Sequence, residues 1–258
     1  MNWITLTTDF GTRDWFVGTM KGVILGIAPR APVVDITHEI PPGDIRAAAF
    51  ALLASYRFFP RGTIHLVVVD PGVGSARQAI AVQTTNFTFL GPDNGVLSWA
   101  LAQEQIKAIR RLDDERYFLR PVSHTFHGRD IFAPVAAHLS RGSPCHRLGK
   151  SLKDYVRLPW PAPTKGHGEI RGEVIYIDHF GNAITNISAE ALAFLRQSAH
   201  GIFAGRKRLC SLERFYQAVP AGKPVAVIGS TGFLEVAVNG GSAAQSLGLK
   251  TGDRVTVR

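Results

Sequence analysis

Cysteine, long apolar runs and clustered charge are all scarce in this chain of 258 residues. The two cysteines, Cys145 and Cys210, lie far apart without metal-type spacing, which favours reduced thiols over a disulfide or a zinc site. No apolar run approaches the roughly 18 residues that span a bilayer. The first residues are typical of a strand and lack the basic head and apolar core of a signal peptide. We therefore expect a cytoplasmic protein without a membrane partner.

Positive charge is in excess, with a formal net charge of +9. Such a balance raises nucleic acid as a partner, but the densest basic patches, at 110–111 and 206–208, are short and carry no interleaved aromatic residues. We interpret them as solvated surface and expect no nucleic-acid partner. A nucleic-acid-binding module built on a small barrel is kept as an alternative from a different class.

The first 150 residues alternate short apolar runs with helical patterns, which is typical of an α/β layer structure. Residues 63–69 form an uninterrupted β-branched run, as expected of a central parallel strand buried on both faces. Further strands are predicted over 3–7, 33–36, 79–83 and 85–90, and helices over 14–27, 44–58, 94–103 and 130–139. The fold class predicted for this part is an α/β domain with a central, mostly parallel sheet.

Residues 158–168 are rich in proline and glycine and are the best linker candidate in the chain. Beyond them, short strands separated by turn signals are typical of a small all-β barrel. They are predicted over 169–178, 183–187, 201–203, 225–228, 234–238 and 254–257. We therefore predict two domains, an α/β catalytic domain over 1–160 and a β-barrel domain over 168–258.

Four polar or glycine-rich clusters lie where a parallel sheet of this kind binds its ligands, near the carboxyl ends of strands or before a helix. They are Thr8-Asp9-Phe10-Gly11, Asp70-Pro-Gly-Val-Gly with Arg77, Gly91-Pro-Asp-Asn-Gly, and Phe126-His127-Gly-Arg-Asp130. Each also has an ordinary structural interpretation as turn chemistry or packing. The second lacks the lysine of a phosphate-binding loop, so a nucleotide triphosphate site is unsupported. Asp9, Asp70 and His127 carry no local metal-ligand motif, and we predict no metal site.

Taken in order, these clusters resemble the S-adenosyl-L-methionine (SAM) hydroxide adenosyltransferases, a family that also contains adenosyl-fluoride and adenosyl-chloride synthases. Further matching pieces lie at 177–182, at 185–186 and from Ser230 to Asn239, so the resemblance spans nearly the whole chain. It implies an α/β domain, a β-barrel and a homotrimer whose active sites lie between the first domain of one subunit and the second domain of its neighbour. It also implies SAM as substrate and no separate cofactor.

The resemblance implies a catalytic set of Asp70, Arg77 and His127 around an attacking water. Halogenating members replace that aspartate and that histidine and place a small hydroxyl residue after the second, where this chain has Gly128. The fluorinating enzymes also carry an inserted loop near residue 84, which this chain lacks. The expected activity is therefore hydrolysis of SAM to adenosine and methionine, with a SAM-dependent halogenase as the alternative and slow halide use left open.

The resemblance also implies a set of substrate-binding residues. Asp9 is expected to hold the ribose hydroxyls, with helix capping as its structural alternative. Phe126 and Phe180 are expected to pack on adenine or face the sulfonium, with core packing as the alternative. The remaining expectations are Asp178 for the methionine ammonium, Asn182 for the adenine edge or the methionine end, and Ser230 for the methionine carboxylate.

Some assignments stay open at this point. Halogenating relatives follow the serine with an arginine for the carboxylate, and Thr231 stands there in this chain, so the partner of that carboxylate is undetermined. The role of Glu235 is unassigned. Either His127 or Asp70 is able to accept the proton of the attacking water, because each is a base that a site can orient.

Overall fold

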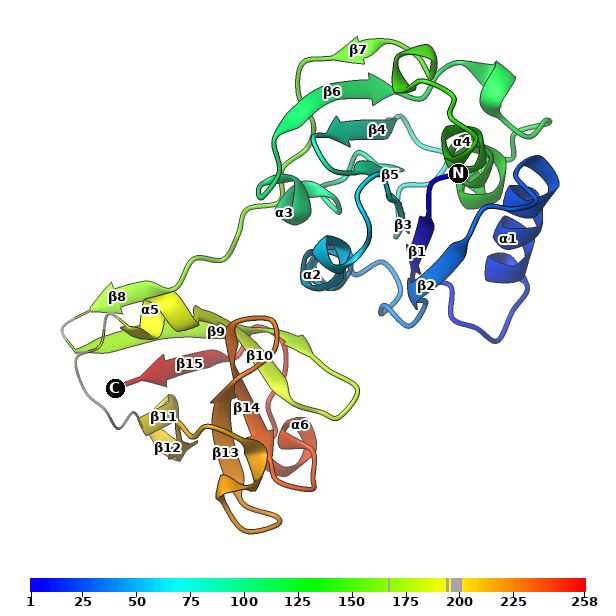
Figure 1. The fold of residues 1–258 in the computed structure, drawn as a ribbon. Coiled ribbons are helices and arrows are strands. Elements are labelled where there is room, and N and C mark those ends of the chain that lie inside the picture. Colours follow the sequence, from blue (N-terminus) through cyan, green and yellow to red (C-terminus); the bar gives the residue numbers. More distant parts are fainter. Residues whose placement is uncertain (167, 194, 196–200) are drawn as a thin grey trace. The chain divides into compact units, whose positions relative to one another are not determined.

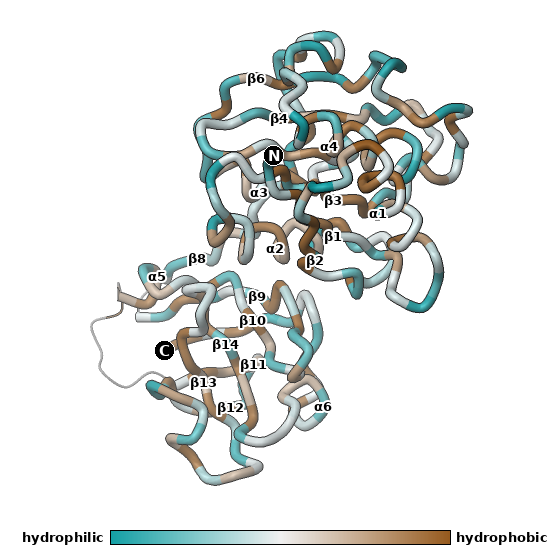
Figure 2. The backbone as a smooth tube through the Cα atoms, turned by 45° about the vertical axis from the view of Figure 1, so that its right-hand side comes forward, coloured by the Kyte–Doolittle hydropathy of each residue, from teal (hydrophilic) through white to brown (hydrophobic). Residues whose placement is uncertain are grey.

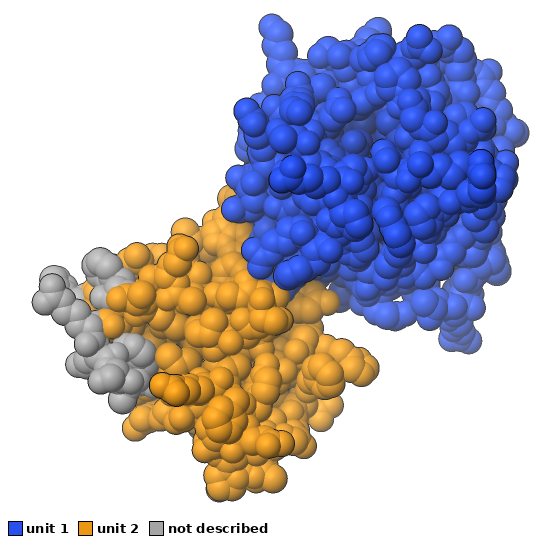
Figure 3. Space-filling view, in the orientation of Figure 1, with its two compact units in different colours: residues 1–158 blue, residues 159–258 orange. Residues whose placement is uncertain are grey.

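The computed structural model describes residues 1–166, 168–193, 195 and 201–258. The chain divides into two compact units, residues 1–158 and 159–258 (Figure 3). The boundary between the units, after Leu158, falls at the start of the predicted linker, whose residue 167 is outside the described residues.

Unit 1 is built on a seven-stranded sheet with strand order β2-β1-β3-β5-β4-β6-β7. Strands β1, β2, β3 and β5 are paired in parallel, whereas β4, β6 and β7 are joined through antiparallel pairs. The strands are β1 (Ile4–Thr8), β2 (Val33–Thr37), β3 (Ile64–Val68), β4 (Ala79–Thr84), β5 (Thr88–Pro92), β6 (Ile106–Arg111) and β7 (Ser151–Leu152). This confirms the predicted α/β class.

Helices cover both faces of this sheet. Figure 1 shows α1 and α4 next to each other on one face and α2 and α3 on the other. The α-helices are α1 (Phe16–Ile27), α2 (Ile45–Ser55), α3 (Ser98–Leu101) and α4 (Ala133–Ser140). Single turns are η1 (Tyr56–Phe58), η2 (Glu115–Tyr117), η3 (Gly128–Phe132) and η4 (Cys145–Arg147). Two layers of helix leave the sheet buried on both sides, as parallel strands require.

The uninterrupted apolar run predicted as a central strand is β3, whose five residues are all buried. In Figure 2 the segment labelled β3 is coloured mainly as hydrophobic. The core on one face joins Leu6 and Leu66 of the sheet to Met20 of α1 and Val135 of α4. On the other face His65 is fully buried among Tyr56 and other aromatic rings, and burial lowers its pKa to about 3. A neutral histidine is therefore a core residue here.

The sequence predictions missed or misplaced several elements of unit 1. Strand β6 was not predicted, and the helix expected over 94–103 is reduced to the four residues of α3. The strand expected over 85–90 begins only at Thr88, because Thr84 and Phe87 close a turn before it. The helix expected from residue 130 is preceded by the wider turn η3 and becomes α-helical at Ala133.

Unit 2 is an eight-stranded antiparallel sheet, which curls into a nearly closed barrel and confirms the predicted class. Its order is β12-β11-β15-β9-β10-β14-β13, with β8 paired to β9. A bridge between Leu212, just after β12, and Ala226 of β13 brings the two end strands together. The strands are β8 (Thr164–Gly166), β9 (Glu169–Ile177), β10 (Ala183–Ser188), β11 (Gly201–Ala204), β12 (Lys207–Ser211), β13 (Pro224–Ile228), β14 (Phe233–Val238) and β15 (Arg254–Val257).

Three short helical pieces complete the barrel unit, α5 (Ala189–Ala193), η5 (Tyr216–Ala218) and α6 (Ala243–Leu247). Strand β12 was not predicted, because its first residues belong to a short basic patch. Both cysteines are buried free thiols, and burial raises the pKa of Cys145 to about 11 and of Cys210 to about 12. No helix in the described ranges is long and apolar enough to cross a bilayer.

Candidate functional site

A cavity of about 550 Å³ opens in unit 1 beside the carboxyl ends of β1 and β3. Three of the four predicted clusters meet in it. It is lined by Asp9, Phe10, Phe16, Pro42, Gly43, Val68, Asp70, Pro71, Val73, Thr125, Phe126, His127 and Gly128. The topology explains this convergence, because parallel strands deliver their following loops to the same edge of the sheet.

Arg77 joins the Asp70 and His127 clusters. Its Nε donates to Asp70 Oδ1 at 2.9 Å, its Nη2 donates to Asp70 Oδ2, and the same Nη2 lies 2.7 Å from His127 Nδ1. The side chains of Arg77 and Asp70 are 11% and 5% exposed, so little solvent screens their ion pair. The three residues predicted as a catalytic set are therefore in direct contact, although fifty residues separate Arg77 from His127.

The protonation state of His127 follows from this geometry. A guanidinium has only N–H donors, so Nδ1 of His127 must accept, and the proton of the neutral ring resides on Nε2. Burial lowers the pKa of His127, and the positive charge of Arg77 lowers it further, against the smaller opposing effect of Asp70. Both effects favour the neutral ring of His127, with its proton on Nε2, in a side chain that lines the cavity.

Asp9 lies on the turn after β1 and lines the cavity. Its Oδ2 accepts a hydrogen bond from the backbone N–H of Gly43 at 2.8 Å. The capping alternative is excluded, because α1 begins at Phe16 and has no side-chain cap. The Gly43 loop therefore holds the carboxylate of Asp9 through one hydrogen bond. The other acceptor positions of its two oxygens are not used by that bond.

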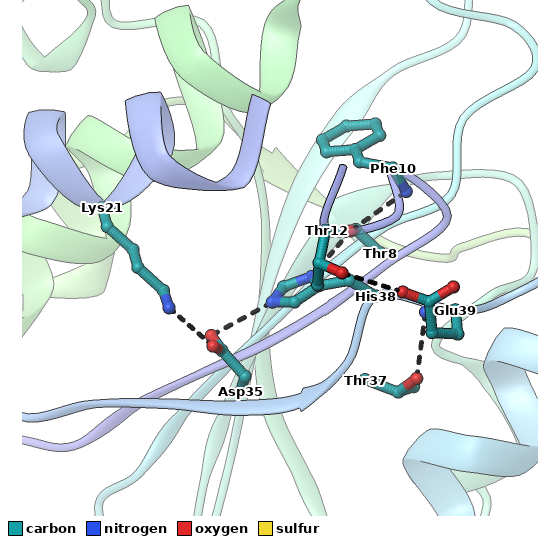
Figure 4. A network of polar contacts seen from close by, with 8 residues as sticks. All are labelled: Thr8, Phe10, Thr12, Lys21, Asp35, Thr37, His38 and Glu39. Carbon is teal, nitrogen blue, oxygen red and sulfur yellow. Dashed lines mark hydrogen bonds and ion pairs between the residues drawn. The ribbon is translucent and has the colours of Figure 1, made fainter. Parts of the chain in front are cut away.

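A polar network braces this turn from behind (Figure 4). His38 Nδ1 lies 2.8 Å from Thr8 Oγ1, and that hydroxyl accepts a hydrogen bond from the backbone N–H of Phe10. On its other side, His38 Nε2 is 3.1 Å from Asp35 Oδ1, and Lys21 Nζ is 2.5 Å from Asp35 Oδ2. The network ties the turn that carries Asp9 and Phe10 to β2 and α1.

Phe126 forms an aromatic cluster with Phe10 and Phe16, at centroid distances of 5.7 and 5.2 Å. It is 9% exposed, so it is both a core residue and part of the cavity wall. Gly128 lies against the same cluster. A Cβ atom there would lie 3.2 Å from Met20 Sδ and 3.2 Å from Phe126 Cε2, so a hydroxyl residue would fit only if these neighbours moved.

Two side chains of the predicted clusters that do not line the cavity, Asn94 and Asp130, have structural roles. Asn94 Nδ2 donates to the backbone carbonyl of Val69 at 2.9 Å and so fixes the residue before Asp70. Asp130 is fully buried and accepts hydrogen bonds from Arg129 Nε and from the backbone N–H of Ser123. These contacts outweigh the effect of burial and keep the pKa of Asp130 low. Both side chains hold loops that carry the cavity residues.

A second cavity of about 660 Å³ lies in unit 2. It gathers all four binding residues predicted in this part of the chain, together with Tyr216 and Glu235. Its lining is Asp178, Phe180, Asn182, Tyr216, Ser230, Glu235, Val238, Gly240 and Gly241. Asp178 and Asn182 form one tight turn, with Asn182 donating from its backbone to Asp178 Oδ1 at 2.8 Å and from Nδ2 to Oδ2 at 3.0 Å.

Phe180 at the tip of this turn is 74% exposed, which rules out the core alternative for this ring. Tyr216 was missed, since nothing in the residues around it forms a motif. Its Oη donates to Glu235 Oε2 at 2.7 Å. Among the described residues, no group of three or more His, Cys, Asp or Glu side chains is placed to hold a metal ion.

The chain thus joins an α/β unit, with an Asp–Arg–His contact in its cavity, to a small barrel with a polar cavity, which is an architecture suited to a two-domain enzyme. The sequence profile of the SAM hydroxide adenosyltransferase N-terminal domain matches residues 4–149, and that of the C-terminal domain matches residues 172–256. The chain belongs to this family.

Individual relatives are similar to this chain over nearly its whole length. A protein of Salinispora tropica named (R)-S-adenosyl-L-methionine hydrolase is 40% identical, covering 99% of this chain and 97% of its own. A protein of Thermus thermophilus with the same name is 42% identical, with 95% of each chain covered. The crystal structure of an uncharacterized conserved protein from Thermotoga maritima superposes with a TM-score of 0.94, at 39% identity, covering 98% of this chain and 99% of that one. A fluorinase of an Actinoplanes species is more distant, at 28% identity over 98% of this chain and 96% of its own.

Proposed function

We propose that this protein is a cytoplasmic enzyme that hydrolyses SAM to adenosine and L-methionine by displacement at C5′ of the ribose. The observation that carries the proposal is the direct contact of Arg77 with both Asp70 and His127 in the unit 1 cavity. Its support from relatives is that the hydrolases at 40–42% identity are more similar to this chain than the fluorinase.

In this reaction the nucleophile, and not the leaving group, is what the enzyme must activate. Methionine leaves from a sulfonium as a neutral thioether, so its departure requires no acid. Water is a poor nucleophile, and a site accelerates the reaction by orienting one molecule in line with the C5′–S bond and taking up its proton. The oxygen forms the new bond to C5′ as the C5′–S electron pair returns to sulfur.

Asp70 is the better proton acceptor of the two candidates. His127 Nδ1 is occupied by Arg77, and Nε2 already carries a proton, so the ring offers the water a donor. The Asp70 carboxylate keeps unused lone pairs after its two bonds to Arg77. In this mechanism His127 orients the water oxygen, Asp70 accepts its proton, and Arg77 holds both side chains in place.

Ribose and base binding follow from the same cavity. The Asp9 carboxylate uses one acceptor position on Gly43 and retains enough to receive both ribose hydroxyls. Phe126 presents an aromatic ring to the cavity, where it packs on the adenosyl group or faces the sulfonium. The contacts to the ribose hydroxyls and to the base are equal in ground and transition state and therefore contribute affinity.

The unit 2 cavity is the proposed binding site for the rest of the substrate. Asp178 receives the methionine ammonium, Asn182 contacts the adenine edge or the methionine end, and Ser230 contacts the methionine carboxylate. The exposed ring of Phe180 packs on adenine or faces the sulfonium. Thr231 replaces the arginine of halogenating relatives, and its hydroxyl is buried without a hydrogen-bond partner in the described part of the chain. That hydroxyl is a second candidate donor for the carboxylate.

The proposal includes a homotrimer in which the unit 1 cavity of one subunit and the unit 2 cavity of its neighbour share one SAM molecule. What supports it is the division of the predicted binding residues between two separate cavities, each with only part of the set. No cofactor or metal ion takes part in the proposed reaction, since the sulfonium is already activated and Arg77 provides the cation beside Asp70.

Chromatographic analysis of the products tests this function. Purified protein incubated with SAM is expected to yield adenosine and methionine in equal amounts, with unchanged rate after treatment with a chelator. The halogenase alternative is tested in the same assay by adding saturating chloride or fluoride. Conversion of most product to 5′-halo-adenosine, or loss of activity on chelation, would contradict the proposal.

A further inference from the structure

Glu235 is a carboxylate buried on the outer face of the barrel, in β14. It is 5% exposed and lies beneath Tyr216, whose own side chain is 40% exposed and lines the unit 2 cavity. Gly229 makes room for it, because a Cβ atom at Gly229 would overlap with Glu235 Oε1. A buried carboxylate costs stability unless it is hydrogen-bonded, so the contact between Glu235 and Tyr216 is central to how this carboxylate is held.

The phenol proton of Tyr216 is directed at Glu235. Its Oη donates to Glu235 Oε2 at 2.7 Å. Burial, reinforced by the negative charge of Glu235, raises the pKa of Tyr216, so the phenol keeps its proton. Burial raises the pKa of Glu235 as well, and the charge of Asp178 adds to that rise. With its single proton engaged, Tyr216 oxygen has only lone pairs left for anything that enters the cavity.

Asp178 presents a second set of acceptors to the same cavity. Asn182 bonds each of its two oxygens once and leaves further lone pairs and the negative charge. A primary ammonium group carries three N–H donors and no acceptor, so it is the group that matches acceptors on two sides.

We propose that Tyr216, with its proton held by Glu235, joins Asp178 in selecting ligands that bear a primary ammonium group, here the α-ammonium of SAM. Glu235 is a positioning residue in this arrangement, because it acts through Tyr216. The inference rests on the proposed function and deepens it, since the resemblance accounts for Asp178 alone.

The test compares two ligands on two proteins. One ligand is SAM, and the other is its analogue with hydrogen in place of the α-amino group. The KM for SAM and the Ki of the analogue are measured for the wild type and for Tyr216→Phe. Loss of a hydrogen bond to a charged group is worth about tenfold or more in affinity. We expect Tyr216→Phe to raise the KM for SAM by that factor, to change kcat by less than about twofold, and to leave the Ki of the analogue within about twofold.

Glu235→Gln separates positioning from packing. Its amide is able to donate to Tyr216 and turn the phenol into a donor, so the same selective loss is expected while Tyr216 remains present. Tyr155→Phe, a phenol of unit 1, is the matched control and should change neither value. Circular dichroism verifies that each variant is folded. Glu235→Gln is used instead of Glu235→Ala because it keeps the size and shape of this buried side chain.

The outcomes are distinct. An equal loss for both ligands would show that Tyr216 only supports the fold, and no loss for SAM would refute the acceptor role. Either result contradicts the inference in a protein that still hydrolyses SAM. If the wild type forms no adenosine from SAM, the proposed function fails, and this inference fails with it.

Discussion

Nη2 of Arg77 lies 2.7 Å from Nδ1 of His127, and this single contact fixes the direction of hydrogen bonding in the cavity. Because Arg77 is only able to donate, Nδ1 of His127 accepts, and the proton of the neutral ring resides on Nε2. In the proposed mechanism the imidazole therefore orients the nucleophile, and Asp70 takes up the proton. This arrangement favours Asp70 in a choice between two bases that the residues alone left open.

Asp70→Asn and His127→Ala are each expected to lower kcat by about 10²–10⁴, the usual value of acid–base assistance. Both residues act on a water that gains charge only as reaction proceeds, so KM should change little. Steady-state kinetics with SAM measure both constants. Asp154→Asn and His146→Ala, which replace exposed side chains, are matched controls and should behave as wild type. Full activity in Asp70→Asn would remove the centre of the mechanism.

Asp9→Ala is expected to lose affinity for SAM and for adenosine alike. Its carboxylate is assigned to ribose hydroxyls, which both molecules carry, and hydrogen bonds to a charged group contribute about tenfold or more. Calorimetric titration of adenosine measures the effect without turnover. Asp14→Ala, an exposed carboxylate five residues away, is the control. An unchanged affinity for adenosine would assign Asp9 to the support of Gly43 alone.

The pH dependence follows from His127, whose pKa is lowered first by burial and then by Arg77. The neutral ring is the active form, because a proton on Nδ1 would meet the N–H of Arg77. Activity should therefore be constant above the usual histidine value of about 6.5 and fall as the pH drops through the lower pKa of His127.

Nuclear magnetic resonance of the His127 ring, assigned with His127→Ala, measures this pKa directly. In Arg77→Gln the lowering effect of the guanidinium is lost while the opposing charge of Asp70 remains, so the pKa should rise. An unchanged or lower value in Arg77→Gln would contradict the contact on which the mechanism depends.

Subunit exchange tests the shared site. Asp70→Asn inactivates the unit 1 cavity and Asp178→Ala the unit 2 cavity. If each site takes one cavity from each of two neighbours in a closed trimer, every mixed trimer contains one fully wild-type site, which is about a third of the wild-type number. Co-expressed variants, purified with two tags, provide the mixed assemblies. Activity no higher than that of the separate variants would place both cavities in the same subunit or exclude a shared site.

The sequence predicted which residues form this site better than it predicted the contacts between them. The strand formed by residues 64–68 was recognisable from its β-branched run, and the polar residues after it were expected at the sheet edge. The contact between Arg77 and His127 depends on how two loops pack, which no local pattern encodes. The same limit applies to Tyr216, since a single tyrosine in a loop carries no sign of the buried carboxylate beneath it.

Two of the missed strands, β6 and β12, have a different cause. Strands β6 and β12 carry arginine and lysine at several positions, including Arg110 and Lys207, so their patterns are those of a polar surface. Strand pairing supplied by neighbours overrides such weak local preference. Helix α3 was overestimated for the opposite reason, because an apolar stretch was interpreted as helical although its ends form turns.

Hydrolysis of SAM in water enriched in oxygen-18 tests the central claim most directly, because it follows the attacking atom itself. One labelled oxygen is expected in the 5′-hydroxyl of adenosine and none in methionine, as measured by mass spectrometry of the separated products. Unlabelled adenosine, or label carried by methionine, would show that water does not attack C5′ and would contradict the roles of Asp70, Arg77 and His127.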